Sequence, residues 1–305
     1  MLASCEAILK VRNVRIMKTL FLTFGDGSPE FKAAATRLVD QAKSIGVFSS
    51  VLSLDHKSLI QVSPEYSIAQ KSIMQLHSYP TYFRAAKSWV IQAGLLGRFG
   101  EFDLVCYADA GCEMVANRIT RQVLRNNLKK AFLYGGLAEQ LPLTERNWTK
   151  KKTMDYFQPS ESHALSGQIQ SGLSYWRVDE RNIELVTKWC SLSDPKLDLW
   201  QDPPSKDSEA DYFIEHRHDQ SLFSLLWKEA GLLVVPVNSH WLLRLPNTRS
   251  ACIPIHTSRN RTGATRLTRS SRSSLVATLG LGINIFGRIT NKGIKIVLKR
   301  AKKNP

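Results

Sequence analysis

The spacing of hydrophobic residues near the start of the chain predicts a strand, a helix and a second strand. Leu20 to Phe24 is a short apolar run, as expected for a buried strand. Ser28 followed by Pro29 marks the start of a helix, and Gly46 can end it. Within that helix the apolar residues recur at helical spacing: Phe31, Ala35, Leu38, Ala42 and Ile45. With a strand expected at 47–54, this βαβ unit predicts an α/β fold with a mostly parallel central sheet flanked by helices.

The pattern continues with alternating helices and strands. It predicts helices at 84–96, 118–130, 180–192 and 218–231, and strands at 103–108 and 232–235. Residues 167–178 predict a strand pair or hairpin, and the polar stretches 137–165 and 193–210 predict loops. Asp219 is expected to cap the helix at 218–231, and Gly231 to end it.

The positive charge is concentrated at the end of the chain. The sequence has 305 residues and a formal net charge of +16. Residues 244–305 hold 14 of the 42 Lys and Arg residues and no Asp or Glu, which leaves 28 basic against 26 acidic residues elsewhere. We therefore expect an N-terminal extension at 1–16, a globular domain at 17–262 and a basic C-terminal extension at 263–305.

Apolar and basic residues alternate in the last part of this extension, as at Ile294, Lys295, Val297 and Lys299. The pattern is typical of a segment that docks on an anionic membrane surface. A disordered solubilising tail fits it nearly as well. Nucleic acid is disfavoured as a partner, because Phe286 is the sole aromatic residue among these basic residues.

The five cysteines are scattered and form no CxxC pair. This argues against a disulfide framework and against a thiolate zinc site, and it favours a reducing, cytoplasmic location. No apolar run reaches the ~18–20 residues that a membrane-spanning helix needs. At the N-terminus the basic residues follow the short apolar piece, the reverse of the order in a signal peptide.

The sequence DLVCYADAGCE places Asp109 directly after the strand expected at 103–108. Open α/β sheets bind ligands at the carboxyl ends of their strands. In sugar-nucleotide transferases an Asp-x-Asp at this place holds a divalent cation on the diphosphate, and Gly111 would leave room for ribose or sugar. An aspartate that only caps its own turn fits these residues equally well.

The sequence EHRHDQS allows three interpretations. Asp219 can be a plain helix cap. His216 and His218 can form the metal pair of a hydrolase, but only in an extended segment, and a second cluster of ligands is missing from the sequence. Alternatively Asp219 and Gln220, at the head of a helix, can hold a sugar's hydroxyl groups or orient an acceptor.

The sequence TFGDGS follows the first strand but lacks the third glycine of a dinucleotide fingerprint, because Glu30 stands in its place. This disfavours a dehydrogenase. In a sugar-nucleotide transferase the same strand end, including Thr23, touches the nucleoside base.

Six blocks taken together resemble a group of bacterial glycosyltransferases of the GT-A fold, which are frequently encoded among surface-polysaccharide genes. The blocks are LTFGD with QAKSIGVFSSV, YFRAAKSWVIQAGL, DLVCYADAGCEM, SGQIQSGLSYWR, FIEHRHDQSLFSLL and IPIHTSRNR, and they cover roughly residues 17–262. The resemblance implies a Rossmann-like nucleotide-diphospho-sugar transferase fold and a cytoplasmic enzyme that uses a nucleotide-sugar donor.

The resemblance also implies roles for individual residues. Those expected to bind the donor are Thr23, Lys87, Asp109, Gly111, Gln168 and Gln170. Those expected to line the sugar or acceptor site and act in catalysis are His218, Asp219 and Gln220. A divalent cation, Mn²⁺ or Mg²⁺, would be held by Asp109 with a C-terminal histidine, His240 or His256. For either histidine a surface or packing role is the competing interpretation.

The sequence departs from the group's pattern at two places. Gly111 replaces the second acidic residue of the usual Asp-x-Asp, and Ala86-Lys87-Ser88 replaces a Trp-Lys-Pro block, keeping only the lysine. Lys87 can still meet a phosphate. The resemblance therefore implies an enzyme that moves a sugar from a nucleoside-diphosphate donor to a saccharide or lipid-linked acceptor in surface polysaccharide synthesis. The alternative is a catalytically silent GT-A-like protein that binds sugars or partners.

Overall fold

The computed structural model describes residues 17–76, 79–194, 197–237 and 253–264. The strands are β1 Thr19–Phe24, β2 Ser50–Leu54, β3 Leu104–Ala108, β4 Glu113–Met114, β5 Gly136–Thr144, β6 Gly167–Arg177, β7 Leu233–Pro236 and β8 Ile255–His256. The helices are α1 Pro29–Ile45, α2 His56–Val62, α3 Pro64–Leu76, α4 Tyr79–Leu95, α5 Arg118–Tyr134, α6 Glu145–Trp148, α7 Lys151–Phe157, α8 Glu161–Leu165, α9 Glu180–Ser191 and α10 Asp219–Glu229, with a 3₁₀ turn, η2, at Lys206–Ser208.

A six-stranded sheet forms the centre of the molecule, in the order β2-β1-β3-β6-β5-β7. Strands β2, β1 and β3 are parallel to one another, as are β5 and β7, and only β6 runs against its two neighbours. A second sheet contains β4 and β8. The expected mixed α/β fold with a mostly parallel sheet flanked by helices is confirmed.

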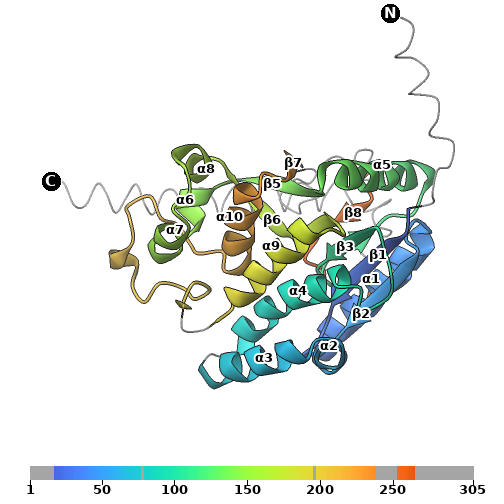
Figure 1. Cartoon of the computed structure of the whole chain (residues 1–305), viewed down its shortest axis with the longest axis horizontal. Helices are drawn as coiled ribbons and strands as arrows, with labels where there is room; N and C mark the ends of the chain where they lie inside the picture. The colour runs from blue at the N-terminus through green and yellow to red at the C-terminus, as the bar shows by residue number, and fades with distance from the viewer. Residues whose placement is uncertain (1–16, 77–78, 195–196, 238–252, 265–305) are drawn as a thin grey trace, which may run out of the picture.

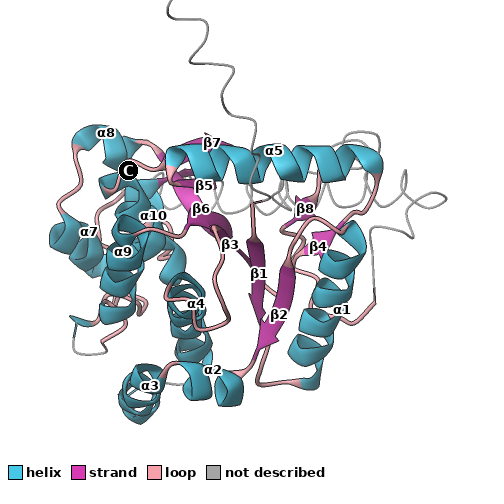
Figure 2. Ribbon diagram, turned by 45° about the vertical axis from the view of Figure 1, so that its right-hand side comes forward, coloured by secondary structure: helices cyan, strands magenta, loops and turns pink. Residues whose placement is uncertain are grey.

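Helices cover both faces of the sheet, as Figures 1 and 2 show. On β1, Leu20 and Leu22 point into the core under α4, α9 and α10, whereas Phe21 points into the core under α1 and α5. All three side chains are fully buried. A strand with both faces buried reads as a continuous apolar run, which is why Leu20 to Phe24 was recognisable.

The local signals around α1 predicted both of its ends. The Ser28 side chain accepts a hydrogen bond from the Phe31 N–H, and Gly46 ends the helix in the left-handed region at φ 62°. The buried face differs in one respect from the expected stripe. Phe31 is 36% exposed, whereas Arg37 is buried at 6% exposure.

The predicted loop at 137–165 is wrong, because this stretch contains β5, α6, α7 and α8. Polar residues on β5 interrupt the run of apolar residues that would have indicated a strand. Glu139 is buried because its carboxylate accepts a hydrogen bond from Gln170, and the Gln140 amide donates to the Gly167 carbonyl. The predicted hairpin at 167–178 is instead the single long strand β6, which pairs with β3 and β5.

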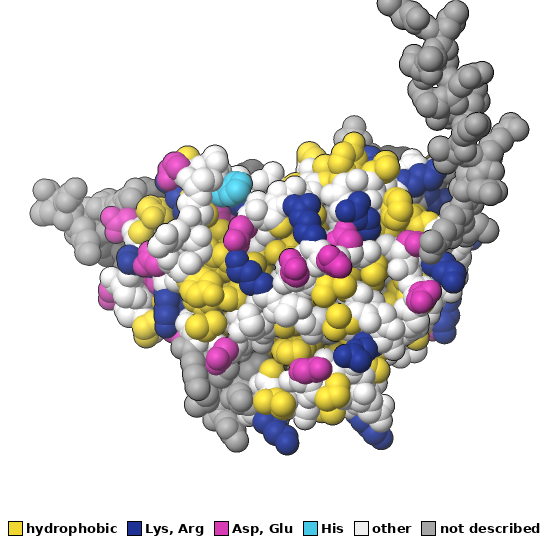
Figure 3. All heavy atoms as spheres, viewed as in Figure 1, with side chains coloured by type: hydrophobic (Ala, Val, Ile, Leu, Met, Phe, Trp, Pro, Cys, Tyr) yellow, Lys and Arg dark blue, Asp and Glu magenta, His cyan; other side chains and the backbone are white. Residues whose placement is uncertain are grey.

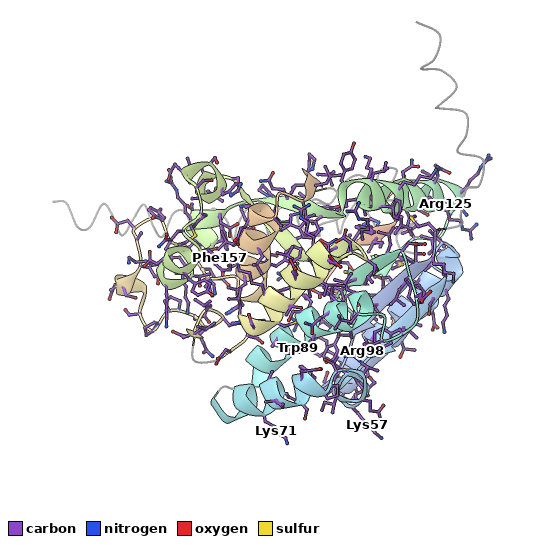
Figure 4. The ribbon with its side chains drawn as sticks, viewed as in Figure 1. Lys57, Lys71, Trp89, Arg98, Arg125 and Phe157 are labelled. Atoms are coloured by element: carbon purple, nitrogen blue, oxygen red, sulfur yellow. The ribbon has the colours of Figure 1, made fainter. Side chains whose placement is uncertain are left out.

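Basic and acidic side chains are interspersed on the face shown in Figure 3, as the near-neutral charge of the domain predicts. Lys57 on α2 and Lys71 on α3 point away from the sheet (Figure 4). Among the described residues no helix is long and apolar enough to span a bilayer, and the described cysteines Cys106, Cys112 and Cys190 are free thiols. The basic segment 265–305 lies outside the described residues.

Candidate functional site

One buried lysine joins two carboxylates that are far apart in the sequence. Lys87 Nζ lies 2.8 Å from Asp219 Oδ2 and 3.0 Å from Asp109 Oδ1. It also donates to Ser171 Oγ at 3.1 Å, and Ser171 in turn donates to Asp219 Oδ2 at 2.9 Å. The structure thus brings together three residues that the sequence analysis placed in separate blocks.

The sheet positions Asp109. The residue directly follows β3, and its backbone N–H donates to the Gly172 carbonyl of β6 at 3.0 Å. A Cβ atom at Gly172 would lie 3.0 Å from Asp109 Oδ2, so a larger residue would crowd the carboxylate. Tyr107 OH donates to the other oxygen, Oδ1, at 3.1 Å. The Asp109 carboxylate thus contacts Lys87 and Tyr107. These contacts disfavour the alternative that Asp109 only caps its own turn.

Exposure and charge differ within this group. The side chain of Asp109 is 44% exposed and that of Asp219 15%, whereas that of Lys87 is 8% exposed. Burial alone would lower the pKa of Lys87, but the carboxylates of Asp109 and Asp219 outweigh it and raise the pKa above its ordinary value. Lys87 is therefore a permanent cation whose position is set by two anions.

Asp219 is the first residue of α10, and His218 holds the cap position. The expected Asp219 cap is therefore wrong at that position. His218 has φ 52° and makes no side-chain capping bond; its Nδ1 instead lies 2.7 Å from the Trp200 carbonyl. This left-handed turn directs Asp219 toward Lys87 and Ser171. A carboxylate in the first turn of a helix is also favoured by the helix dipole.

His216 is a structural residue. Its Nδ1 accepts from the Lys150 N–H at 3.2 Å, and its Nε2 lies 2.9 Å from the Leu199 carbonyl. The ring is 1% exposed. Because both ring nitrogens contact the backbone, His216 cannot pair with His218 as a ligand of a hydrolytic metal.

Gln168 and Gln220 belong to a buried polar network instead of an open pocket. Gln220 Nε2 donates to Gln168 Oε1 at 2.7 Å, and Gln168 Nε2 donates to Glu145 Oε1 at 3.0 Å. Glu145 Oε2 also forms an ion pair with Lys228 Nζ at 2.7 Å, in which the side chain of Lys228 is 5% exposed and that of Glu145 is fully buried. Gln168 is fully buried and Gln220 is 8% exposed. The network fixes α10 against β6 and α6, so both glutamines support the site from behind.

Two further expected donor residues are buried. Gln170 is 2% exposed, donates to Glu139 Oε2 at 2.7 Å and accepts from Thr257 at 3.4 Å. Thr23 is fully buried on β1, and its hydroxyl has no hydrogen-bond partner. Of the expected donor residues considered so far, Asp109 has the most exposed side chain.

The space expected beside Gly111 is filled by the chain itself. A Cβ atom there would lie 3.2 Å from Arg259 Cα. The Asn260 N–H donates to the Gly111 carbonyl at 2.8 Å, and Ser258 Oγ donates to the same carbonyl at 3.1 Å. The 258–262 segment, rather than a sugar, therefore covers Gly111.

Arg37 of α1 holds this arrangement together. Its guanidinium donates to the carbonyls of Ala110 at 3.0 Å, Cys112 at 2.8 Å and Asn260 at 3.2 Å, and also to that of Thr262. One buried cation thus ties the turn after β3 to a segment almost 150 residues later in the chain. The sequence showed only an arginine beside a helical stripe.

The described residues do not fit a divalent cation at Asp109. They contain no group of three or more His, Cys, Asp and Glu side chains able to hold a metal. Gly111 removes the second carboxylate, and Lys87 already lies against Asp109. His256 lies opposite Glu113 in the antiparallel pairing of β8 with β4. His240 lies outside the described residues.

Comparison with known proteins gives only distant structural similarities. No family model matches the sequence, and no curated protein matches it. A solved glycosyltransferase involved in glycosylation of the major capsid of PBCV-1 has 11% identity and a TM-score of 0.46, covering 80% of this chain and 95% of its own. Mouse xyloside xylosyltransferase 1 has 13% identity and a TM-score of 0.42, covering 81% of this chain and 99% of its own.

A third solved structure is 4-diphosphocytidyl-2C-methyl-D-erythritol synthase from Anaerococcus prevotii. It has 8% identity and a TM-score of 0.34, and the match covers 73% of this chain and 87% of that one. At these identities and TM-scores the structural similarities carry no argument about the reaction.

Proposed function

We propose that the protein is a glycosyltransferase that takes its sugar from a nucleoside diphosphate. The observation that carries the proposal is the pair of carboxylates, Asp109 and Asp219, joined by the buried Lys87. The pair lies at the carboxyl end of β3, the edge at which open α/β sheets bind ligands. The resemblance of the six sequence blocks supports the same reaction class.

The reaction breaks the bond between the sugar's anomeric carbon and the diphosphate oxygen. A bond forms between that carbon and an acceptor hydroxyl oxygen, and the hydroxyl proton must leave. Asp219, oriented by Lys87 and Ser171, would orient the acceptor or accept this proton. Lys87 would stabilise the negative charge on the departing diphosphate, and Asp109 would hold Lys87 in position.

The remaining catalytic and donor residues receive supporting roles in this proposal. His218 sets the turn that presents Asp219, and Gln168 and Gln220 fix α10 behind it. The sequence-based expectation of Mn²⁺ or Mg²⁺ on Asp109, His240 and His256 enters no step, because the described ligands do not fit a divalent cation. Activity in EDTA, with and without added Mn²⁺, tests this directly.

The acceptor is proposed from the resemblance alone to be a saccharide, free or lipid-linked, in surface polysaccharide synthesis at the cytoplasmic side of a membrane. The basic segment after residue 264 would then dock on anionic lipid. Asn260 Nδ2 donates to the Ala264 carbonyl at 2.8 Å, so the chain should be shortened after Ala264 and not earlier. Such a chain should keep donor hydrolysis and lose co-sedimentation with anionic vesicles; unchanged vesicle binding would contradict the docking role.

A catalytically silent sugar-binding protein is the second candidate, favoured by Gly111 in place of the second aspartate. A panel of UDP-, GDP- and dTDP-sugars separates the two. An enzyme releases nucleoside diphosphate in repeated turnovers from at least one donor. A silent protein binds a donor or a sugar, but no nucleoside diphosphate is released.

A further inference from the structure

Arg259 is placed by three separate contacts. A Cβ atom built on Gly111 would lie 3.2 Å from the Cα atom of Arg259, so the two backbones are closely packed. The next residue, Asn260, is bound through its N–H to Gly111 and through its carbonyl to Arg37. Arg259 itself has φ 53°, a conformation that costs a non-glycine residue about 1 kcal/mol or more. Such a conformation persists only where the surrounding contacts hold it.

The position that this backbone fills has a specific chemical meaning. A Cβ atom at residue 111 would lie 3.2 Å from Arg259 Cα, so an aspartate there would require the Arg259 backbone to shift by a few tenths of an ångström. The close packing of this segment thus favours glycine where an Asp-x-Asp pair has its second carboxylate. It also places the backbone of an arginine next to residue 111.

The charges around Arg259 also favour an anionic ligand. Arg259 is an exposed residue, but partial desolvation of its guanidinium and the charges of Arg217 and Arg261 lower its pKa, while Asp109 and Glu215 act in the opposite direction. Arg217 lies over the Trp148 ring at 5.7 Å and precedes the turn that presents Asp219. Asp109, the most exposed member of the Asp109–Lys87–Asp219 group, is thus one of the charges that act on Arg259.

We infer that Arg259, together with Lys87, binds the diphosphate of the nucleotide donor in place of a divalent cation. The inference rests on the proposed function and names the group that holds the donor in the same site. A planar guanidinium suits this role because it can donate two parallel hydrogen bonds to phosphate oxygens. Lys87 already donates its three N–H groups to Asp109, Asp219 and Ser171, so it contributes positive charge from α4, and Arg259 makes the hydrogen bonds to the diphosphate.

The test measures binding of UDP, GDP and dTDP, and of the matching monophosphates, to the full-length protein in EDTA by titration calorimetry. Arg259→Gln should weaken diphosphate binding by about 10- to 100-fold, the scale of one lost charge-assisted hydrogen bond. Monophosphate binding should change by less than about threefold, and Arg259→Lys should restore part of the loss. Arg261→Gln is the charge-matched control: it removes a positive charge near Arg259 whose guanidinium lies 5.4 Å from the Phe31 ring, and so measures the effect of lost charge alone.

The outcomes separate the inference from the function on which it rests. If no nucleoside diphosphate binds, the proposed function is wrong and the inference with it. If a diphosphate binds but Arg259→Gln behaves like Arg261→Gln, only the inference is overturned. A wild-type protein that loses diphosphate binding in EDTA and regains it with Mn²⁺ also overturns the inference, because a metal then does the work assigned to Arg259.

Discussion

The ammonium group of Lys87 lies 2.8 Å from the carboxylate of Asp219, although 132 positions separate the two residues in the chain. This contact connects the middle of α4 to the first turn of α10. With Asp109 at the end of β3, it makes a three-residue charged group whose members come from three elements of the fold.

Replacing Asp219 with serine should reduce turnover at least ~10²-fold, the scale of a positioned acid–base group. The thermal melting temperature should fall, because the buried Lys87 loses one of its two carboxylate partners, so turnover is compared at a temperature where the variant is folded. Asp179→Ser is the matched control, since Asp179 caps α9 through the Asn182 N–H at 2.9 Å, and serine keeps a capping oxygen. Equal activity of Asp219→Ser and the wild type would rule out a role for this carboxylate in the reaction.

Lys87→Met should abolish most turnover, because it leaves two carboxylates facing each other and removes the cation that would stabilise the leaving diphosphate. Lys87→Arg, which keeps the charge, should retain more activity than Lys87→Met. The control is Lys188→Met, which breaks an exposed pair with Glu229 and should leave kcat/KM unchanged. Near-normal turnover by Lys87→Met would contradict the account of this site.

The sequence predicted elements whose signals are local. Ser28, Pro29 and Gly46 set the two ends of α1 through contacts with their own helix, so a reader of the sequence can see both. The same holds for β3 and the aspartate after it. The sequence marked Asp109 by its place after a strand, Asp219 by its place at the head of a helix and Lys87 through the resemblance alone, and it could not show that the three touch.

Contacts between distant segments were beyond the reach of the sequence. Arg37 is buried because carbonyls from two distant segments surround it, and no pattern within α1 predicts that. Glu139 and Gln140 interrupt the apolar pattern of β5, because their hydrogen-bond partners, Gln170 and the Gly167 carbonyl, lie on the neighbouring strand β6. Gln168 was expected to bind the donor because of the resemblance, and its bonds to Glu145 and Gln220 could not be seen in the sequence.

Gln168→Leu should lower the free energy of unfolding by about 2–3 kcal/mol, because Gln220 and Glu145 each lose a buried partner. Its KM for the donor should stay close to the wild-type value in the folded protein. Denaturant unfolding and steady-state kinetics measure the two effects. Gln122→Leu on the exposed face of α5 is the control and should change neither. A large rise in KM without loss of stability would return Gln168 to the donor site.

His56 should make the fold sensitive to acid. Burial lowers the pKa of His56 from 6.5 to about 4, while Asp26 and Asp55 oppose the shift. As pH falls from about 6.5 toward 4, His56 is protonated in the unfolded chain but stays neutral in the folded protein. The free energy of unfolding therefore decreases over this pH range.

Between pH 7.5 and 4.5 the expected loss is about 2–3 kcal/mol, measured by urea unfolding. His56→Gln should remove that part of the pH dependence while still offering an acceptor to Tyr66, whose hydroxyl lies 2.5 Å from His56 Nδ1. An identical pH dependence in the variant would show that other groups cause the loss.

Release of nucleoside diphosphate from UDP-, GDP- and dTDP-sugars is the measurement that tests the central claim most directly. It compares the wild type with Asp109→Asn and with the control Asp103→Asn, which makes the same change at the opposite end of β3, where Asp103 accepts from the Lys18 N–H at 2.8 Å. The account predicts turnover of at least one donor by the wild type and by Asp103→Asn, and a loss of at least ~10²-fold in Asp109→Asn, whose melting temperature is unchanged. Equal turnover by all three proteins, or turnover of no donor, would contradict it.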